Sequence, residues 1–374
     1  MAKKQIIPYG HQWISADDIK EVVRVLKSDW LTQGPKIEEF EKAVAKYCGS
    51  KYAAAVSSGT AALHAAYFAA GLKKGDEVIT TPLTFAATSN MLVFCGAKPV
   101  FADIERDTLN IDPSEIIKKI NAKTKAIVIV DFAGNPCDFD KISKIAKDNN
   151  LLVIEDACHA LGAEYKGKKI GSFSDMTILS FHPVKHIATG EGGMILTNNK
   201  DFYEKIKIFR HHGAKKKPEK GGWYYEIKKP GFNYRITDMQ CALGLSQLRK
   251  LNKFLQRRKE IAKTYNKAFK NIEKITLPVE KNYAKSAWHI YPVQVKGTDR
   301  RRAFDALSKQ GVGVQVHYLP LHLQPFYQKE FDYKKGDFPL AEQYYERAIT
   351  LPLFPKMTNK DIQYVIKSVK KTLI

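Results

Sequence analysis

The chain has 374 residues, of which 44% are hydrophobic and 27% are charged. This composition excludes disordered and collagen-like chains, and the length predicts two domains. The formal net charge of +22 is compatible with a nucleic-acid partner, with small anionic substrates or with a solvated, lysine-rich surface. Because no nucleic-acid-binding motif accompanies the charge, we do not expect a nucleic-acid partner.

The five cysteines are scattered and form no C-x-x-C pair, which argues against a disulfide framework and a zinc site. We therefore expect buried free thiols and no metal. No window approaches the roughly 18 consecutive apolar residues that a membrane helix needs. The start, MAKKQIIPYG, lacks the apolar stretch of a signal peptide. We expect a cytoplasmic protein with no membrane contact.

Two helices are predicted at the start of the chain. Ser15 and Asp18 form a capping-box pattern that opens a helix through about Lys27. Pro35 suits the first position of a second helix, which ends on Gly49.

From residue 52 onward, short apolar strands alternate with amphipathic helices, which indicates parallel β-α-β units and a sheet covered on both faces. The predicted strands are YAAAVSS, DEVIT, KPVFADI, KAIVIVD and LLVIED. The predicted helices between them are GTAALHAAYFAAG, FAATSNMLVFCG, DPSEIIKKI and DFDKISKIAKDN. The strands MTILSF and GMILT then follow without an obvious long helix between them, which predicts some non-parallel pairing.

The pattern changes near residue 235. A long basic helix is predicted for TDMQCALGLSQLRKLNKFLQRRKEIAKTYNKAF, followed by strands HIYPVQVK and VGVQVHY and by helices near 299–309, 340–348 and 359–371. The predicted fold class is therefore α/β. A large, mainly parallel-sheet domain occupies residues 1–235, and a connecting helix with a smaller α+β domain occupies residues 236–374.

Three features lie where the chain leaves a strand of the large domain, the edge at which open α/β sheets bind ligands. In the first, SSGTAAL, a helix begins near Gly59, and its free N–H groups favour a phosphate, with hydroxyl groups from Ser58 and Thr60. An ordinary helix N-cap is the alternative. The segment does not match G-x-x-x-x-G-K-[ST], which argues against a nucleoside-triphosphate P-loop.

The second feature, LLVIEDACHA, places Asp156 at a strand exit and His159 three residues later. Such an aspartate can be a helix cap, a metal ligand or a charge partner, but no acid–histidine cluster nearby supports a metal. His159 either contacts the same ligand or faces solvent.

The third feature, MTILSFHPVKHIATGEGGMILT, leaves a strand through Ser180 and places Lys185 in a loop before three glycines. Burial lowers the pKa of a lysine and makes the neutral amine available for Schiff-base chemistry. A surface lysine is the alternative.

Together these features match the needs of pyridoxal 5′-phosphate (PLP). Lys185 can hold the aldehyde as an imine, Asp156 can keep the pyridinium nitrogen protonated, and the helix N-terminus near Gly59 can hold the phosphate. Phe85, after DEVITTPLT, is the candidate for stacking on the ring; a core phenylalanine is the alternative.

Six segments resemble, in this order, those of the sugar-nucleotide aminotransferases of the DegT/DnrJ/EryC1/StrS family. They are SSGTAALHAA, TTPLTFAATSN, VIEDACHALGA, SFHPVKHIATGEGGM, GFNYRITDMQCALGLSQL and VHYLPLHLQPFY. The resemblance extends from LTQGPKIEEFE to the C-terminus. It implies the fold-type I aspartate aminotransferase fold, PLP as cofactor and a homodimer with active sites at the subunit interface.

The resemblance also implies roles for single residues. Lys185 is the lysine that binds the cofactor as an imine and moves the proton, and Asp156 pairs with the ring nitrogen. Phe85 covers the ring, and His159 lies on the side of its hydroxyl group. The cofactor phosphate is held by Gly59, Thr60 and Ser180, with Ser58 beside them, and by Asn233 of the neighbouring subunit.

Finer details point to one branch of the family. Lys185 argues against a branch that has histidine at this position and dehydrates its substrate. VDFAG, EDACHALGAEYKGKKIG and SFHPVKHIATGEGG are most similar to the branch of pseudaminic acid biosynthesis. This implies transfer of an amino group from L-glutamate to C4 of a UDP-linked 4-keto-6-deoxy-N-acetyl hexose.

Members of the bacillosamine type or the dTDP-amino-sugar type are the alternative. The stereochemistry of the sugar and the choice between glutamate and glutamine stay open. The residue that binds the donor carboxylate also stays open, with Arg235 as a candidate.

Overall fold

In the computed structural model, which describes residues 6–373, two helices precede the first strand, as predicted. Helix α1 (Ala16–Leu26) begins with the N–H of Ser15 donating to Oδ2 of Asp18 over 2.8 Å. Helix α2 (Pro35–Cys48) ends at Gly49, whose φ of 74° is a left-handed conformation that glycine adopts without strain. The first five residues of the segment inspected for a signal peptide lie outside the described range.

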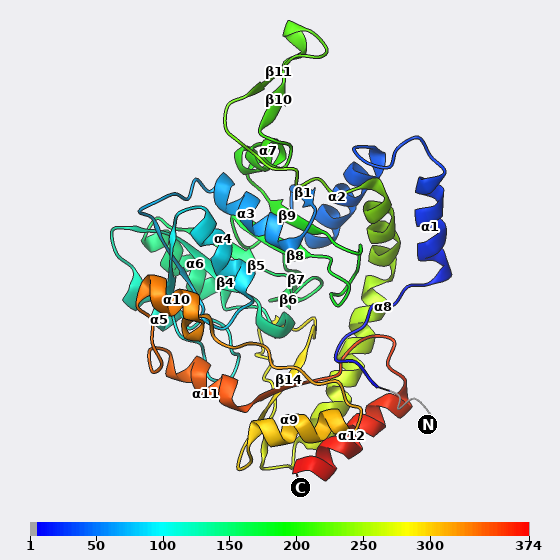
Figure 1. Ribbon diagram of the computed structural model, residues 1–374, viewed down its shortest axis with the longest axis vertical. Coiled ribbons are helices and arrows are strands. Elements are labelled where there is room, and N and C mark those ends of the chain that lie inside the picture. Colours follow the sequence, from blue (N-terminus) through cyan, green and yellow to red (C-terminus); the bar gives the residue numbers. More distant parts are fainter. Residues whose placement is uncertain (1–5, 374) are drawn as a thin grey trace.

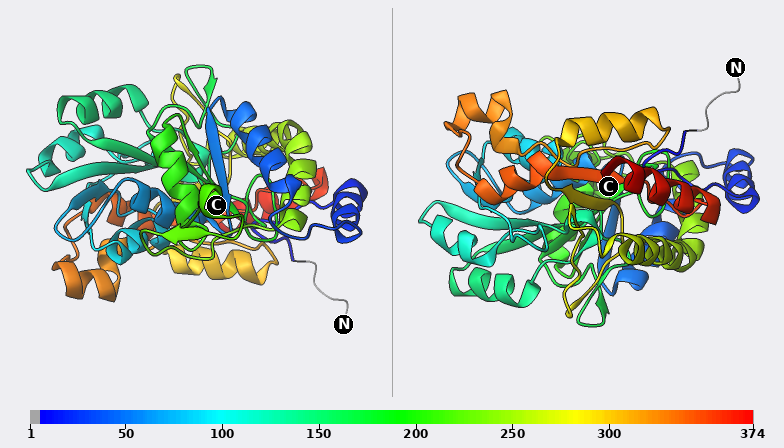
Figure 2. Two further views of the ribbon diagram at one scale, coloured as in Figure 1. Left: turned by 90° about the horizontal axis from the view of Figure 1, so that it is seen from above. Right: turned by 90° about the horizontal axis from the view of Figure 1, so that it is seen from below.

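A seven-stranded sheet forms the centre of the molecule, in the order β1-β9-β8-β5-β4-β2-β3 (Figures 1 and 2). Only β9 runs against its neighbours β1 and β8, so the non-parallel pairing predicted for MTILSF and GMILT is confirmed. The strands are β1 (Tyr52–Val56), β2 (Glu77–Thr80), β3 (Lys98–Phe101), β4 (Thr124–Val130), β5 (Leu152–Asp156), β8 (Met176–Ser180) and β9 (Gly193–Thr197).

Helices cover both faces of this sheet, because successive strand residues point to opposite sides. Ile127 and Ile129 of β4 belong to the apolar cluster under α2 and α6, whereas Ala126 and Val128 belong to the cluster under α3 and α4. The four helices between the parallel strands lie where they were predicted. They are α3 (Gly59–Ala69), α4 (Ala86–Phe94), α5 (Pro113–Lys119) and α6 (Phe139–Asp148).

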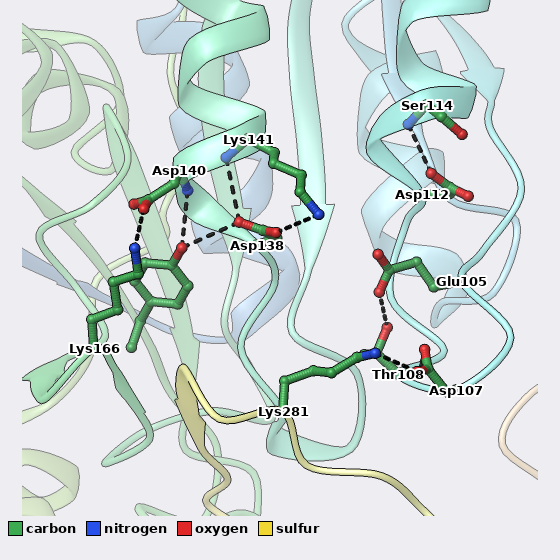
Figure 3. Close-up of polar contacts among 11 residues, drawn as sticks. Glu105, Asp107, Thr108, Asp112, Ser114, Asp138, Asp140, Lys141, Lys166 and Lys281 are labelled. Carbon is green, nitrogen blue, oxygen red and sulfur yellow. Dashed lines mark hydrogen bonds and ion pairs between the residues drawn. The ribbon is translucent and has the colours of Figure 1, made fainter.

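Side-chain caps and ion pairs stabilise the part of the sheet that carries α5 and α6 (Figure 3). Oδ1 of Asp112 and Oδ1 of Asp138 accept N–H groups from the first turns of α5 and α6, at 2.7 and 3.3 Å. Lys281 pairs with Asp107 and so joins the chain after residue 235 to this edge. Within residues 6–373 no group of three or more histidine, cysteine or acidic side chains is arranged to hold a metal ion.

A helix that the sequence analysis did not predict follows the sheet. Helix α7 (Lys200–Phe209) is capped by Asn199, whose Oδ1 accepts the N–H of Asp201 at 2.8 Å, and it buries Ile206 and Phe209 against α3. Beyond it a hairpin of β10 (Ala214–Lys216) and β11 (Tyr225–Ile227) projects from the body of the molecule (Figure 1).

The long helix α8 (Asp238–Phe269) runs along the molecule as predicted and leads into the C-terminal part (Figure 1). Three more helices and one strand also lie where they were predicted. They are α9 (Arg300–Lys309), α11 (Pro339–Arg347), α12 (Asn359–Leu373) and β14 (Tyr291–Val295).

The prediction of a strand at VGVQVHY is wrong. The edge of β14 is already occupied by β15 (Ala348–Leu351), which the sequence analysis had placed partly in a helix. Residues 312–318 therefore make only isolated bridges, from Val312 to Ile7 and from Gln315 to Thr350. The rest of the segment extends toward the large sheet.

The remaining elements are short. They are β6 (Glu164–Tyr165), β7 (Lys168–Lys169), β12 (Ile275–Thr276), β13 (Ala284–Lys285) and α10 (Pro325–Phe331), with 3-10 turns at Phe132–Gly134, Pro218–Lys220 and Leu321–Leu323.

Residues after 255 form an apolar cluster of their own around β14, α9 and α12. Several contacts nevertheless cross the predicted boundary at residue 235. Besides the ion pair of Lys281 with Asp107, Ile7 joins this cluster and β13 pairs with β6. The division into domains at 1–235 and 236–374 stays a prediction.

All five cysteines are free, as expected, although only Cys48, Cys137 and Cys241 are buried. Among the helices formed by residues 6–373, none has the length and apolar character needed to span a bilayer. The cytoplasmic location stays a prediction.

Candidate active site

A cavity of about 600 Å³ lies at the carboxyl ends of β4, β5 and β8, where Val130, Asp156 and Ser180 line it. The N-terminus of α3 forms a second wall, and the segment from Gln315 to Tyr318 forms the wall opposite the sheet. Eight of the nine residues that the sequence analysis assigned to a site line this one cavity. They are Ser58, Gly59, Thr60, Phe85, Asp156, His159, Ser180 and Lys185.

The first turn of α3 is packed tightly against the ends of two strands. A Cβ on Gly59 would lie 3.0 Å from Cβ of Ser180, and a Cβ on Gly193 would lie 2.3 Å from the carbonyl oxygen of Ser58. The first N–H groups of a helix have no partner within it, so this turn suits a phosphate. Ser58 also serves as the N-cap, because its Oγ accepts the N–H of Ala61 at 3.0 Å.

Asp156 is held rigidly with its carboxylate at the cavity. Its Oδ2 accepts the hydroxyl of Thr88 at 2.7 Å, and its Oδ1 accepts the N–H of Cys158 at 3.2 Å. The preceding Glu155 points to the other side of β5, where its Oε2 accepts the hydroxyl of Thr177 at 2.6 Å. Burial raises the pKa of Glu155 well above its usual range. Of the two neighbouring acids, Asp156 alone faces the site.

Lys185 lies in the loop after β8, and its Nζ is 3.5 Å from Nε2 of His289. Desolvation lowers the pKa of the Lys185 amine, and the charge of Arg258 lowers it further, against the opposing effects of Cys158 and Asp156. A larger fraction of the Lys185 amine is therefore neutral than in a lysine of ordinary pKa, and the neutral amine can act as nucleophile and base.

The sequence analysis missed two residues of this region: Tyr318, which lines the cavity, and His289, which does not line it but contacts Lys185 and His159. His289 is buried, and its ring centroid lies 4.3 Å from that of His159. Nε2 of His159 is 3.3 Å from the hydroxyl of Tyr318, while its Nδ1 has no partner among residues 6–373. Desolvation lowers the pKa of both imidazoles well below the usual range, so both are neutral. His159 therefore does not face solvent.

Phe85 is not a core residue, since 59% of its surface is exposed. It stands before the first turn of α4 at the cavity wall, with its ring centroid 6.1 Å from that of Tyr318. The two aromatic rings are placed to contact a planar ligand.

The ninth of these residues, Asn233, lies outside this cavity, and so does Arg235, the candidate for binding the donor carboxylate. Asn233 is exposed and bridges His211, and Arg235 lines a second cavity of about 480 Å³. Nη1 of Arg235 is 2.9 Å from Nδ1 of His211. Neither residue lines the cavity of Lys185 in its own chain.

The two histidines that flank Lys185 differ. His182 lines the mouth of the cavity and is exposed. His186 is buried behind it, with its Nε2 3.1 Å from the carbonyl oxygen of Ala287.

The residues of the cavity fit PLP. The helix N-terminus suits its phosphate, the fixed carboxylate of Asp156 suits its ring nitrogen, and the amine of Lys185 suits its aldehyde. The volume is in the range of cavities that enclose a small cofactor. Sheet order and site together define a fold-type I PLP-dependent transferase.

A model of the DegT/DnrJ/EryC1/StrS aminotransferase family matches residues 12–370. The chain therefore belongs to this family of PLP-dependent aminotransferases, which confirms the predicted resemblance, fold class, enzyme class and cofactor.

Relatives match the chain over nearly its whole length. The UDP-4-amino-4,6-dideoxy-N-acetyl-beta-L-altrosamine transaminase of Campylobacter jejuni is 42% identical, covering 96% of each chain. The spore coat polysaccharide biosynthesis protein SpsC of Bacillus subtilis is 43% identical, covering 98% of this chain and 97% of SpsC. The structure of Helicobacter pylori PseC, an aminotransferase involved in the biosynthesis of pseudoaminic acid, is similar with a TM-score of 0.94 at 37% identity, covering 99% of each chain.

Proposed function

We propose that the protein transfers the amino group of L-glutamate to C4 of a UDP-linked 4-keto-6-deoxy-N-acetyl hexose, as in pseudaminic acid biosynthesis. The observation that carries this proposal is the meeting of Lys185, Asp156 and the N-terminus of α3 in one cavity, in a chain 42% identical to a transaminase of a UDP-amino sugar. The similarity to SpsC supports the alternative of another nucleotide sugar within the same family.

Different residues of the cavity would have different roles in such a transfer. Bound PLP supplies an electron sink for the negative charge that develops when a C–H bond breaks. The amine of Lys185 takes a proton from the donor amino acid and returns a proton to the sugar carbon when the steps run in reverse. Asp156 would hold a proton at the ring nitrogen, and the first turn of α3 would anchor the phosphate. Phe85 and Tyr318 line the same cavity and would contact the bound ring.

We also propose that the protein is a homodimer with shared active sites. Asn233, which the family resemblance assigns to the phosphate, lies outside its own chain's cavity. The projecting β10–β11 hairpin carries exposed Trp223 and Tyr225, which are 83% and 58% accessible. Apolar surface of this kind is typical of protein interfaces, and a second copy of the chain would cover it.

The function is tested by offering UDP- and dTDP-linked 4-keto sugars with L-glutamate or L-glutamine and detecting the amino sugar by mass spectrometry. We expect product from the UDP-linked 4-keto-6-deoxy-N-acetyl hexose with glutamate, and none from a Lys185→Ala variant. Product from dTDP-linked sugars alone would favour the alternative, and no product from any sugar would contradict the proposal.

A further inference from the structure

A buried arginine outside the cavity has so far entered only through the effect of its charge on the pKa of Lys185. Arg258 of α8 is 1% exposed, and its Nη1 donates to the carbonyl oxygens of Trp288, His289 and Leu353 at 3.2, 3.0 and 3.1 Å. Its Nε has no partner, and no carboxylate within the described part of the chain pairs with it. Burying a charge without a counter-ion costs folding free energy, so we expect Arg258 to have a function that offsets this cost.

The contacts of Arg258 converge on the segment that carries His289. Trp288 has a φ of 49°, a left-handed conformation that bulky residues rarely adopt. Arg258 binds the carbonyl groups of both Trp288 and His289 at this point. The imidazole of His289 in turn reaches Nζ of Lys185 at 3.5 Å. Arg258 thereby holds the strained turn that places an imidazole beside the reactive amine.

The charge of Arg258 also acts on its neighbours. Burial lowers the pKa of Arg258 to about 9, which leaves the guanidinium charged near neutral pH. Burial is the main reason that the pKa values of Lys185, His186 and His289 are low, and the positive charge of Arg258 lowers them further, because a nearby like charge disfavours the protonated form. Other titratable groups interact with the Lys185 amine from the elements around it. They are Asp156, Cys158, His159, His186, His289 and His317.

We propose that Arg258 is a positioning residue for the transamination: it fixes His289 beside Lys185, and its buried charge favours the neutral amine of Lys185. That the neutral amine of Lys185 serves in transamination rests on the proposed function. The protonation state of this amine can be measured whether or not that function is correct. Arg258 does not line the cavity, so it acts through the side chains that surround Lys185.

Two variants separate charge from hydrogen bonding. Arg258→Lys keeps the charge and a donor for the carbonyl groups, and Arg258→Gln keeps a donor but removes the charge. The full-length protein, freed of cofactor, is labelled with acetic anhydride at a series of pH values, and acetylation of Lys185 is measured by peptide mass spectrometry. We expect the Lys185 profile of Arg258→Gln to move to higher pH by roughly one unit, and that of Arg258→Lys to stay near the wild type.

Circular dichroism and thermal melting confirm that each variant is folded before it is labelled. Arg258→Met is a second neutral variant in case Arg258→Gln does not fold, because apolar side chains are often tolerated in place of buried charges. It should move the profile in the same direction. An unshifted profile in a folded neutral variant, or an equal shift in Arg258→Lys, would overturn the inference.

Turnover of the keto sugar is measured separately on the same preparations after PLP is restored. A shifted Lys185 profile in a protein that aminates no sugar would support the role of Arg258 and reject the proposed function. If the protein aminates the keto sugar but its neutral variants keep the wild-type Lys185 profile, the proposed function would be supported and the role of Arg258 rejected.

Discussion

Glu155 and Asp156 are adjacent carboxylates, yet only one of them faces the cavity. Alternation along β5 sends Glu155 into the interior, toward Thr177, and leaves Asp156 at the site beside Thr88. The sequence showed that an acid ends this strand. The sequence also placed Ser58 and Ser180 at the ends of strands, because the motifs that contain them follow directly after apolar strands along the chain.

We predict that Asp156→Asn lowers turnover by about 100-fold, since the amide loses a charge-assisted hydrogen bond of up to ~3 kcal/mol to the protonated ring nitrogen. Binding of PLP should also weaken, and both effects are measured by steady-state kinetics and cofactor titration. Asp140→Asn is the matched control, because Asp140 is exposed and pairs with Lys166 away from the cavity. Equal kinetics in Asp156→Asn and the wild type would contradict the role of Asp156 in keeping the ring nitrogen of PLP protonated.

His289 and Tyr318 were not predictable in the same way. They lie 104 and 133 positions after Lys185 in the sequence, in segments whose local pattern indicates only a strand. Nothing in AWHIYPV or VHYLP shows that these side chains contact His159. Contacts between segments so far apart depend on the packing of the whole chain, which periodicity does not encode.

At the scale of elements, the strand–turn–helix unit at β1 and α3 depends on glycines that keep the turn close to the sheet. The alternation of strands and helices made this unit predictable. Helix α7 was missed although Asn199 caps it. The strand expected at VGVQVHY failed for a tertiary reason, because β15 takes the place beside β14.

We predict that Gly193→Ala weakens PLP binding by at least about tenfold and lowers the melting temperature. The new methyl group would clash with the carbonyl oxygen of Ser58 and displace the first turn of α3, which we propose holds the phosphate. Fluorescence titration and thermal melting measure the two effects. Gly222→Ala is the control, because a Cβ there would meet nothing within 4 Å. Wild-type affinity in Gly193→Ala would show that the turn does not hold the phosphate.

At the scale of the whole molecule, the cavity is closed by parts of the chain that are distant in sequence. Tyr9 and the segment from Gln315 to Tyr318 form the wall opposite the strand ends. The ion pair of Lys281 with Asp107 and the pairing of β13 with β6 join the C-terminal part to the large sheet. The long helix after residue 235 was predictable, but these crossing contacts were not.

Mixed dimers test whether two copies share each site. A dimer of one Asn233→Ala chain and one Lys185→Ala chain contains one site with both residues intact, if Asn233 acts in the neighbouring site. An equal mixture, unfolded and refolded together, should therefore regain about a quarter of wild-type activity when chains pair at random. No recovery beyond the sum of the separate variants would argue against shared sites.

The central claim is that Lys185 is the amine that carries the cofactor. Borohydride reduction of the protein loaded with PLP, followed by peptide mass spectrometry, tests this claim most directly. We predict a phosphopyridoxyl group on Lys185 in stoichiometric amount. A protein that binds no PLP, or one that carries the group on another lysine, would contradict the account.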